Sequence, residues 1–297
     1  MNFYKHLTIL YIFLCLPLLN ANKTVTDLVV FSYNRSMQLY AFLESIEKYV
    51  TGIHKTSIIY RADTDSHQAG YQIVKSRFTS YHYMRQGESP RTDFKPLTLT
   101  ASFHHSTAPY IAYGVDDIVV KDYVDLTECA QLLEKYNAYG FYLRLGKNLT
   151  ECYSLRQTQP LPPLHEVEPG VFSWHFHQGM GDWRYPHSVD MTVIRKSDII
   201  ADFSRMIYHS PNSLEGQWAS RDHAIMHRTG LCYELSKIVN FPLNLVQHDW
   251  SNRHMTEYTP EQLLTLFMEG KKMDIEPIHQ MYNPGAHTEY SPTFVER

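Results

Sequence analysis

The sequence predicts an α/β fold in which a mostly parallel central sheet is flanked by helices. Strand-like and helix-like runs alternate through the first half of the chain, polar and acidic residues follow the strand-like runs, and no internal repeat interrupts the pattern. Chains of this kind form parallel sheets whose ligands bind beyond the carboxyl ends of the strands. We therefore expect the functional residues at one edge of the sheet.

Composition places the chain among globular proteins of ordinary charge. It has 297 residues, of which 43% are hydrophobic and 20% charged, and its formal net charge is −4 at pH 7. This length is sufficient for one large α/β core. The negative balance and the lack of a long Lys/Arg run argue against binding to a phosphate backbone, so we expect no nucleic-acid partner.

Residues 1–21 are expected to be a signal peptide or a signal anchor. Lys5 and His6 precede an apolar run from Leu7 to Leu19. The run is shorter than the roughly 20 residues of a membrane span, and it suits a signal peptide cut near Ala21. We expect an exported protein or one of a secretory compartment, touching a membrane only through this segment if it stays uncleaved. A cytoplasmic or membrane-associated protein is the alternative.

The first half of the chain has the pattern of four strands with helices between them. The expected strands are Asp27–Tyr33, Thr56–Asp63, Tyr81–Gln86 and Ala108–Asp117, and the expected helices are Ser36–Val50, His67–Phe78 and Asp93–His105. Apolar residues in the first of these helices recur every three or four positions, as on a buried helix face. The loops after the four strands should gather at one sheet edge.

The second half departs from this rhythm. A helix over 125–136 and strands over 138–145 and 189–196 surround an irregular insert, 157–187, that is rich in Pro and aromatic residues. Connections of this length in a compact domain are usually functional or disordered, and the aromatic residues argue against disorder.

The tail has one clear helix start. Thr259, Pro260 and Gln262 form an N-cap, a first-turn proline and a capping box before an apolar run.

Two adjacent carboxylates, Asp116 and Asp117, end the fourth expected strand. Like charges at this spacing repel unless a cation or strong donors offset them. A divalent cation is one partner that would do so, because hard cations prefer carboxylate oxygens. An acid pair at a turn or helix start is the alternative interpretation.

The strand that enters the polar loop Tyr33-Asn34-Arg35 and the acid pair about 80 residues later together resemble the GT-A fold, a Rossmann-related fold of nucleotide-sugar-dependent glycosyltransferases (family 2-like). The resemblance covers Asp27 to about Asp249 as an order of elements. It departs from the D-x-D pattern of that fold, because Val115 stands where the first Asp would be.

The resemblance implies a metal-dependent glycosyltransferase that moves a sugar from a nucleotide-sugar donor to a carbohydrate or another hydroxyl acceptor. It implies a single GT-A-like catalytic domain over 22–297, with 22–125 as the nucleotide-binding half and 126–297 as the acceptor-binding half. Mn²⁺ or Mg²⁺ is the implied cofactor. Asp117 is its expected first ligand, Asp116 a second ligand or a ribose contact, and His248 a third, with His287 as the alternative to His248.

The base and ribose pocket is expected from loop residues after the first three strands. These residues are Ser32, Asn34, Arg35, Arg61, Asp63 and Arg85, with Lys95 close to the diphosphate or the base. Arg and Lys suit phosphate oxygens as fixed charges. Each of them, taken singly, is also compatible with a solvated surface position.

The resemblance also points to an acid at a helix start beyond the strand 189–196 as the general base. Glu215 is the candidate, with Asp222 behind it, because a helix-start carboxylate stays ionised near neutral pH and can accept a hydroxyl proton. Asp182 is the rival from the insert, whose Trp and Tyr rings suit the faces of an acceptor sugar. An aromatic minicore under a long loop is the competing interpretation of the insert.

Two other functions stay open at this level. One is a carbohydrate-binding protein without turnover on the same scaffold. The other is a nucleotidyltransferase, although such enzymes usually open with a Gly-rich basic loop, which the stretch 31–38 lacks.

Overall fold

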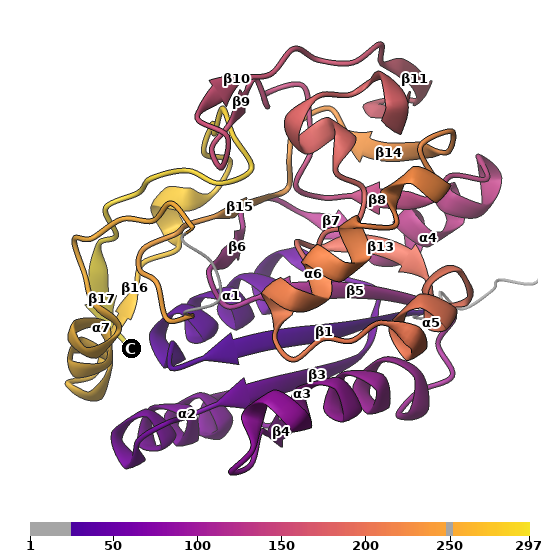
Figure 1. Cartoon of the computed structure of the whole chain (residues 1–297). Helices are drawn as coiled ribbons and strands as arrows, with labels where there is room; N and C mark the ends of the chain where they lie inside the picture. The colour runs from indigo at the N-terminus through magenta and orange to yellow at the C-terminus, as the bar shows by residue number, and fades with distance from the viewer. Residues whose placement is uncertain (1–24, 248–251) are drawn as a thin grey trace, which may run out of the picture.

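A nine-stranded sheet runs through the protein and carries helices on both faces (Figure 1). The computed structural model describes residues 25–247 and 252–297. In chain order, the strands of this sheet are β1 (Thr26–Tyr33), β3 (Ile53–Arg61), β4 (His82–Arg85), β5 (Tyr110–Val115), β8 (Gly140–Tyr142), β11 (His165–Glu168), β12 (Val171–His175), β13 (Thr192–Arg195) and β14 (Thr229–Tyr233).

Strand direction in the sheet is mostly uniform. The order is β11-β12-β14-β8-β13-β5-β1-β3-β4, and β1, β3, β4 and β5 form a parallel block, as expected. Two strands are reversed: β13 is antiparallel to β5 and β8, and β12 is antiparallel to β14 and β11. Because β13 is reversed, its start lies beside the end of β5, at the edge where the functional loops were expected.

The helices of the described part are α1 (Ser36–Tyr49), α2 (Asp65–Arg77), α3 (Pro90–Leu99), α4 (Leu126–Lys135), α5 (Lys196–Arg205), α6 (Pro211–Ala219) and α7 (Pro260–Met268). The shorter strands are β2 (Val50–Thr51), β6 (Ile118–Val120), β7 (Val124–Asp125), β9 (Glu151–Cys152), β10 (Gln157–Thr158), β15 (Ile238–Asn240), β16 (Lys271–Met273) and β17 (Phe294–Glu296).

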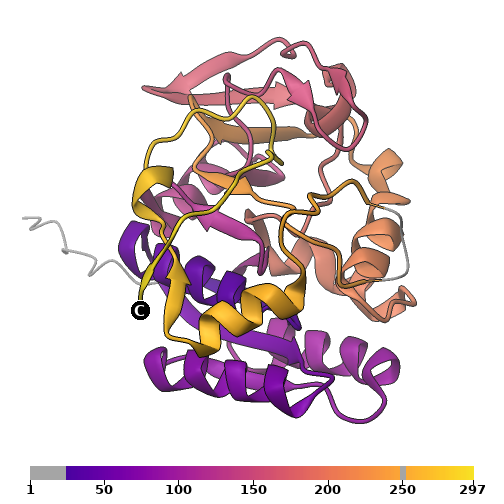
Figure 2. The ribbon, with the colours of Figure 1, turned by 90° about the vertical axis from the view of Figure 1, so that its left-hand side faces the viewer.

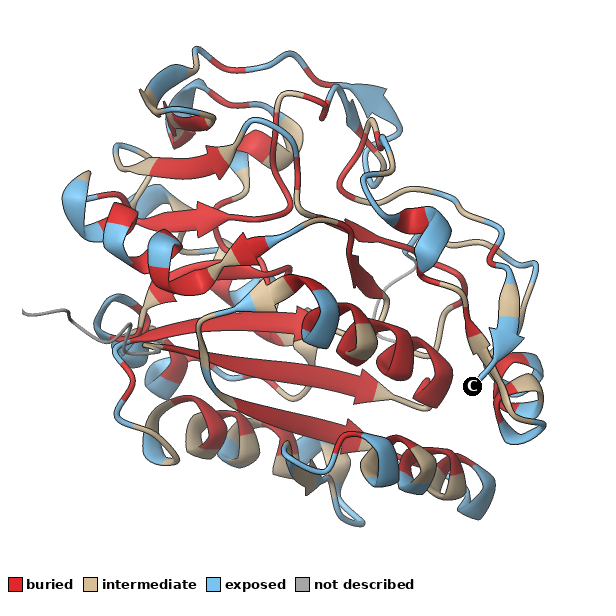
Figure 3. Ribbon diagram, turned by 180° about the vertical axis from the view of Figure 1, so that it is seen from behind, coloured by how far each residue is buried: buried red, intermediate tan, exposed pale blue. Residues whose placement is uncertain are grey.

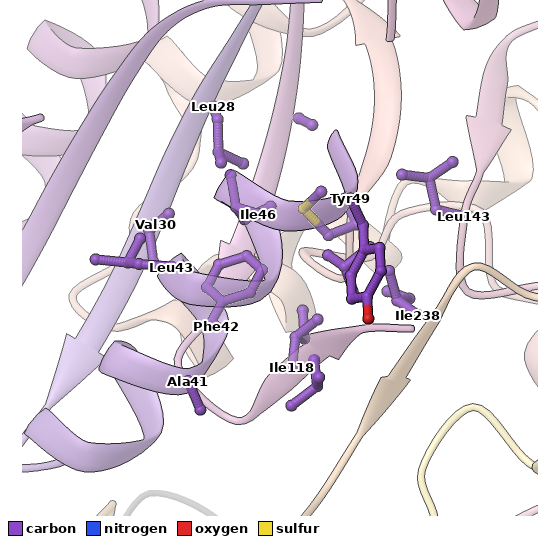
Figure 4. Close-up of a cluster of buried hydrophobic side chains, with 14 of the residues drawn as sticks. Leu28, Val30, Ala41, Phe42, Leu43, Ile46, Tyr49, Ile118, Leu143 and Ile238 are labelled. Carbon is purple, nitrogen blue, oxygen red and sulfur yellow. The ribbon is translucent and has the colours of Figure 1, made fainter. Parts of the chain in front are cut away.

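Side chains of β1 alternate between two hydrophobic cores. Leu28 and Val30 pack with α1, where Phe42 and Ile46 meet them (Figure 4). Val29 and Phe31 point to the opposite face, where α3, α5 and α6 cover the sheet. This alternation follows from the period of two in a strand. The central strands are accordingly buried along most of their length, whereas the outer faces of the helices are exposed (Figure 3).

The helix expected over 93–105 begins earlier and changes its winding. Pro90 is the first residue of α3, so Pro96 lies inside the helix, and a π-helical turn, Thr100–His104, follows. The expected N-terminus of the tail helix is confirmed, because Thr259 Oγ1 accepts from the Gln262 N–H and the Gln262 side chain accepts from the Thr259 N–H.

The aromatic insert is folded inward. Trp174 and Trp183 are 1% and 0% exposed, and Trp174 Nε1 donates to the Trp183 carbonyl at 2.9 Å. Their rings therefore form the minicore, and neither offers a face to a sugar. Tyr185 is the aromatic residue of this part of the insert that reaches the cavity described below.

The C-terminal segment leaves α7, crosses the molecule to β15 and then returns toward α7, where its last strand, β17, pairs with β16 (Figure 2). Ala286 accepts a backbone hydrogen bond from Asn240, and Asn240 accepts one from Thr288, each at 3.0 Å. Asn283 is fully buried, and its main-chain carbonyl accepts from Asn148 Nδ2 at 2.7 Å. These bonds fix the segment against β15 and the loop after β8.

Over residues 25–247 and 252–297, no helix has the length and apolar character needed to cross a bilayer. The expected signal peptide or anchor, 1–21, lies outside the described residues.

Candidate active site

A cavity of about 890 Å³ opens at the edge of the sheet where β1 and β5 end. Its lining includes Arg35 after β1, Asp117 after β5, Asp190 before β13, Glu215 on α6 and His287 of the C-terminal segment. Residues from both halves of the chain therefore face one space. Its volume is within the range of ordinary small-molecule sites.

Asp116 is the more enclosed of the two adjacent acids. It is 4% exposed; its Oδ2 accepts from Ser32 Oγ at 2.8 Å and from the Tyr33 N–H at 3.1 Å, and its Oδ1 accepts from Arg35 Nη1 at 3.1 Å. Burial raises the pKa of Asp116 to about 6 against the opposing effect of Arg35. Both carboxylate oxygens are thus engaged by the protein.

Arg35 is the cation that offsets the two adjacent acids. The same Nη1 donates to Asp117 Oδ2 at 3.1 Å, and Arg35 Nε donates to Asn244 Oδ1 at 2.9 Å. The guanidinium also donates to the Asn244 carbonyl. Its position is therefore set from two sides, and its charge offsets the repulsion between the two acids.

Asp117 is the member of the pair that is better placed for a divalent cation. One oxygen accepts from Arg35, and the side chain is 16% exposed and lines the cavity. Mg²⁺ is commonly held by one or two carboxylates together with substrate phosphates and water. Asp117 fits this chemistry, whereas both oxygens of Asp116 are already hydrogen-bonded.

A complete metal site is not formed by protein side chains alone in the described ranges, where no group of three or more His, Cys, Asp or Glu is arranged to hold an ion. His248, the expected third ligand, lies outside the described residues. Its alternative, His287, lines the cavity, with Nε2 4.0 Å from Asp190 Oδ2.

Glu215 faces the cavity from α6 and is half-buried. Its Oε1 accepts from the Val189 N–H at 3.1 Å. Withdrawal from water, and then the charge of Asp190, raise the pKa of Glu215 to about 7. Glu215 lies beyond the first turn of α6, not at the helix start, and burial moves its pKa toward neutral pH.

Asp190 is a candidate that sequence reasoning missed. It is 7% exposed, lines the cavity and has its pKa raised by burial, against the effects of His287 and Arg144. The next residue, Met191, has a φ of 50° and donates its N–H to the Tyr113 carbonyl at 2.7 Å. No local motif marks Asp190; only the reversed direction of β13 brings it to this edge.

Asp182 lines the cavity but is held from several sides. Arg144, which is 2% exposed, places Nη1 3.3 Å from Asp182 Oδ1, and Gln159 Nε2 donates to Asp182 Oδ2 at 3.2 Å. Arg144 also donates to the carbonyl of Tyr185 at 2.6 Å. This arrangement suits a structural acid that fixes the insert better than a base free to take a proton.

Asp222 lies apart from the cavity lining, with Oδ1 2.6 Å from the Nδ1 of the buried His187.

The site residues expected from the sequence divide into those that line the cavity and those that do not. Among the described residues, those that line the cavity are Ser32, Arg35, Arg61, Asp116, Asp117, Asp182 and Glu215, and those that do not are Asn34, Asp63, Arg85 and Lys95. Lys95 Nζ donates to the carbonyls of Ser204 and Met206, at 2.9 and 2.6 Å, so it caps the end of α5 away from the expected diphosphate site.

The chain is similar in sequence to a known glycosyltransferase. No protein-family model matches it. A curated relative described as "Bifunctional glycosyltransferase pgtA", from Dictyostelium discoideum, is 25% identical over 189 residues, which cover 58% of this chain and 24% of the relative. The chain therefore matches about a quarter of the length of that relative. The resemblance to glycosyltransferases expected from the sequence is confirmed by this match.

A solved structure, "Mannosyltransferase PcManGT from Pyrobaculum calidifontis in complex with GDP-Man and Mn2+", superposes with a TM-score of 0.38 and 8% identity. The superposition covers 70% of this chain and 54% of that one.

Proposed function

We propose that the chain is a nucleotide-sugar-dependent glycosyltransferase of GT-A-like fold that transfers a sugar to a hydroxyl acceptor. The observation that carries the proposal is one cavity with two unlike walls. Asp117 and Arg35 line it from the loops after β5 and β1, which we call the donor wall, and Glu215 lines it from α6, which we call the acceptor wall. The sequence match to part of a curated glycosyltransferase supports the same class.

The donor wall is proposed to receive the diphosphate. Asp117, supported by Asp116, would hold Mn²⁺ or Mg²⁺, with His248 or His287 as a further ligand. When bound, such an ion offsets the negative charge that grows on the leaving diphosphate. Arg35, held in place by Asn244 and Asp116, adds a fixed positive charge on this wall.

The acceptor wall is proposed to supply the general base. Glu215 would take the proton of the acceptor hydroxyl while the acceptor oxygen bonds to the anomeric carbon. The bond from that carbon to the phosphate oxygen breaks, and its electron pair leaves with the nucleoside diphosphate. A base is most effective when its pKa is close to the working pH, which the pKa of about 7 satisfies. Asp182 is the rival base.

We further propose that 22–297 acts as one catalytic domain, with 22–125 forming the nucleotide half and 126–297 the acceptor half. Export through residues 1–21 is proposed from their sequence alone. Donor supply would then depend on a compartment that contains nucleotide sugars.

Calorimetry with nucleoside diphosphates, with and without Mn²⁺, tests the donor side. Incubation with nucleotide sugars then tests turnover, since metal-dependent release of the nucleoside diphosphate excludes a carbohydrate-binding protein without activity. Release of pyrophosphate from a nucleoside triphosphate and a sugar phosphate would instead support a nucleotidyltransferase. Absence of nucleotide binding under all these conditions would contradict the proposal.

A further inference from the structure

Two histidine rings lie close together on the outside of the aromatic insert. His175 ends β12, His177 belongs to the short 3₁₀ turn Phe176–Gln178, and the centroids of the two rings are 5.5 Å apart. The residues that alternate with them, Trp174 and Phe176, are 1% and 0% exposed, whereas His175 is half-buried and His177 is exposed. The buried neighbours therefore anchor the backbone that carries both imidazoles.

Both rings turn the same nitrogen toward the same loop. His175 Nδ1 is 3.3 Å from the carbonyl oxygen of His227, and His177 Nδ1 is 3.2 Å from that of Met226. A carbonyl oxygen only accepts, so Nδ1 carries the proton in each ring, and in the neutral imidazole the lone pair is then on Nε2. Metal-binding histidines are usually fixed in this way, by a hydrogen bond from the nitrogen that does not bind the metal.

The separation of the rings suits one shared ion. A Zn²⁺ ion lies about 2.1 Å from an imidazole nitrogen, and hence about 3.2 Å from the centre of the ring. Two rings that share one tetrahedral ion therefore have centres about 5.2 Å apart. The 5.5 Å between the centroids of His175 and His177 is close to this distance. Within the described ranges, neither Nε2 has a hydrogen-bond partner in the protein.

The surroundings of the pair select the kind of cation. Among the residues that the structure describes, no third His, Cys, Asp or Glu joins these two histidines in a metal-binding group. Arg184 Nη1 donates to the His177 carbonyl at 3.3 Å, which brings a positive charge close to the pair. Mg²⁺ and Mn²⁺ prefer oxygen ligands and should not bind here, whereas Zn²⁺ and Cu²⁺ suit imidazole nitrogen.

We propose that His175 and His177 bind one divalent transition-metal ion of the Zn²⁺ or Cu²⁺ type through their Nε2 atoms, with water completing the coordination. Neither histidine belongs to the described lining of the cavity, so this site is separate from the one proposed at Asp117. Since both rings also bond to the loop 226–227, the ion strengthens the attachment of β12 to that loop. The inference does not depend on the proposed function.

Calorimetric titration of the full chain with Zn²⁺ tests the site. His175→Ala and His177→Ala should each lower the affinity of this site for Zn²⁺ at least about tenfold, since loss of even an outer partner of a ligand costs that much. Asp117→Asn should keep the same Zn²⁺ binding event as the wild type. Mg²⁺ should not compete for it.

His82→Ala is the matched control. The rings of His82 and His105 form another close pair, with centroids 4.7 Å apart. Among the described residues, however, His105 Nδ1 is buried without a hydrogen-bond partner, and Lys55 Nζ donates to the His105 carbonyl at 3.2 Å. This pair lacks the fixed tautomers and lies beside a positive charge, so the variant should leave Zn²⁺ binding unchanged.

Two other measurements do not depend on calorimetry. With Cu²⁺ as the probe, the electron paramagnetic resonance spectrum should show coupling to two imidazole nitrogens, which each histidine variant reduces to one or none. The melting temperature of the wild type should rise with Zn²⁺ concentration, because a ligand that binds the folded state stabilises it. The histidine variants should lose this rise, and their melting without metal shows that they are folded.

Three results would overturn the inference. Unchanged Zn²⁺ affinity in both histidine variants would show that the pair does not bind the ion. An equal loss in His82→Ala would mean that Zn²⁺ binds to surface histidines without selection. Loss of the Zn²⁺ event in Asp117→Asn alone would place the ion in the cavity.

Discussion

Asp116 and Glu215 are both withdrawn from water, but their neighbours differ. Asp116 accepts hydrogen bonds from Ser32, the Tyr33 N–H and Arg35. Glu215 accepts one from the Val189 N–H and faces the like charge of Asp190. The hydrogen-bond donors and the charge of Arg35 favour the ionised form of Asp116 against the repulsion of Asp117, whereas the repulsion of Asp190 adds to burial in disfavouring the ionised form of Glu215. The surroundings therefore suit Asp116 to holding Arg35 in place and Glu215 to transferring a proton.

Asp117→Asn should abolish Mn²⁺-dependent nucleotide binding and leave the fold intact. The change removes a charged ligand for a hard cation, while the β5 core beneath it is untouched. Calorimetry with and without Mn²⁺ measures the loss. Asp122→Asn, which affects a partly exposed ion pair with Lys237, is the control and should bind normally. Unchanged affinity in Asp117→Asn would refute the metal assignment.

Glu215→Gln should reduce transfer to an acceptor by roughly 100-fold or more, because Gln keeps the shape but cannot take a proton. Donor affinity should hardly change, since Glu215 faces the proposed acceptor side. Steady-state transfer assays and calorimetry give the two quantities. If Asp182→Asn stops transfer and Glu215→Gln does not, the base lies in the insert. If transfer persists in both variants, neither acid is the base, which leaves Asp190 or a route that needs no protein base.

The pH dependence should follow the same residue. Glu215 must lose its proton to act as a base, so transfer should increase as the pH rises through about 7. Stability should change in the opposite sense. In the folded protein the pKa of Glu215 lies above its ordinary value of 4.5. The contribution of Glu215 to the free energy of unfolding is therefore fully present below pH 4.5 and is lost as the pH rises through about 7. Unfolding of wild type and Glu215→Gln at several pH values checks the sign, and a pH-independent difference would contradict it.

At the scale of the element, local signals were predictable and strand direction was not. The capping box at Thr259 lies within four consecutive residues, so the sequence alone located the start of α7. Asp190 reaches the cavity only because β13 runs antiparallel between β5 and β8, and the alternation of apolar residues is the same for either direction. The inward turn of Trp174 and Trp183 depends on contacts distant in sequence, so composition could not separate a minicore from a sugar platform.

Thr259→Ala should lower the free energy of unfolding by about 1 kcal/mol, because it removes the side-chain acceptor of the α7 cap. Thr265→Ala in the same helix is the control, since the Thr265 hydroxyl donates to the Glu261 carbonyl one turn earlier and its loss should cost less than about 0.5 kcal/mol. Denaturant unfolding followed by circular dichroism compares them. Equal effects would mean that the cap contributes little.

At the scale of the whole molecule, residues 1–21 are proposed to be a signal peptide, which would belong to no core of the folded protein. A chain that begins at Asn22 should therefore fold like the full-length chain, with the same melting temperature. Size-exclusion chromatography and thermal melting provide the comparison. Aggregation of the shortened chain alone would show that the N-terminal segment is structural and would remove the case for a signal peptide.

The return of the C-terminal segment to β15 has a consequence for synthesis on the ribosome. The pairing of Asn240 with Ala286 and Thr288, and the arrival of His287 at the cavity, must wait until the stretch after α7 has been translated. The parallel block of β1, β3, β4 and β5 emerges long before. A nascent chain can thus pair the strands that precede Arg35 and Asp117 early, but Asn244, which holds Arg35, and the C-terminal segment follow later. Translation products that stop before the C-terminal segment should therefore lack a finished site.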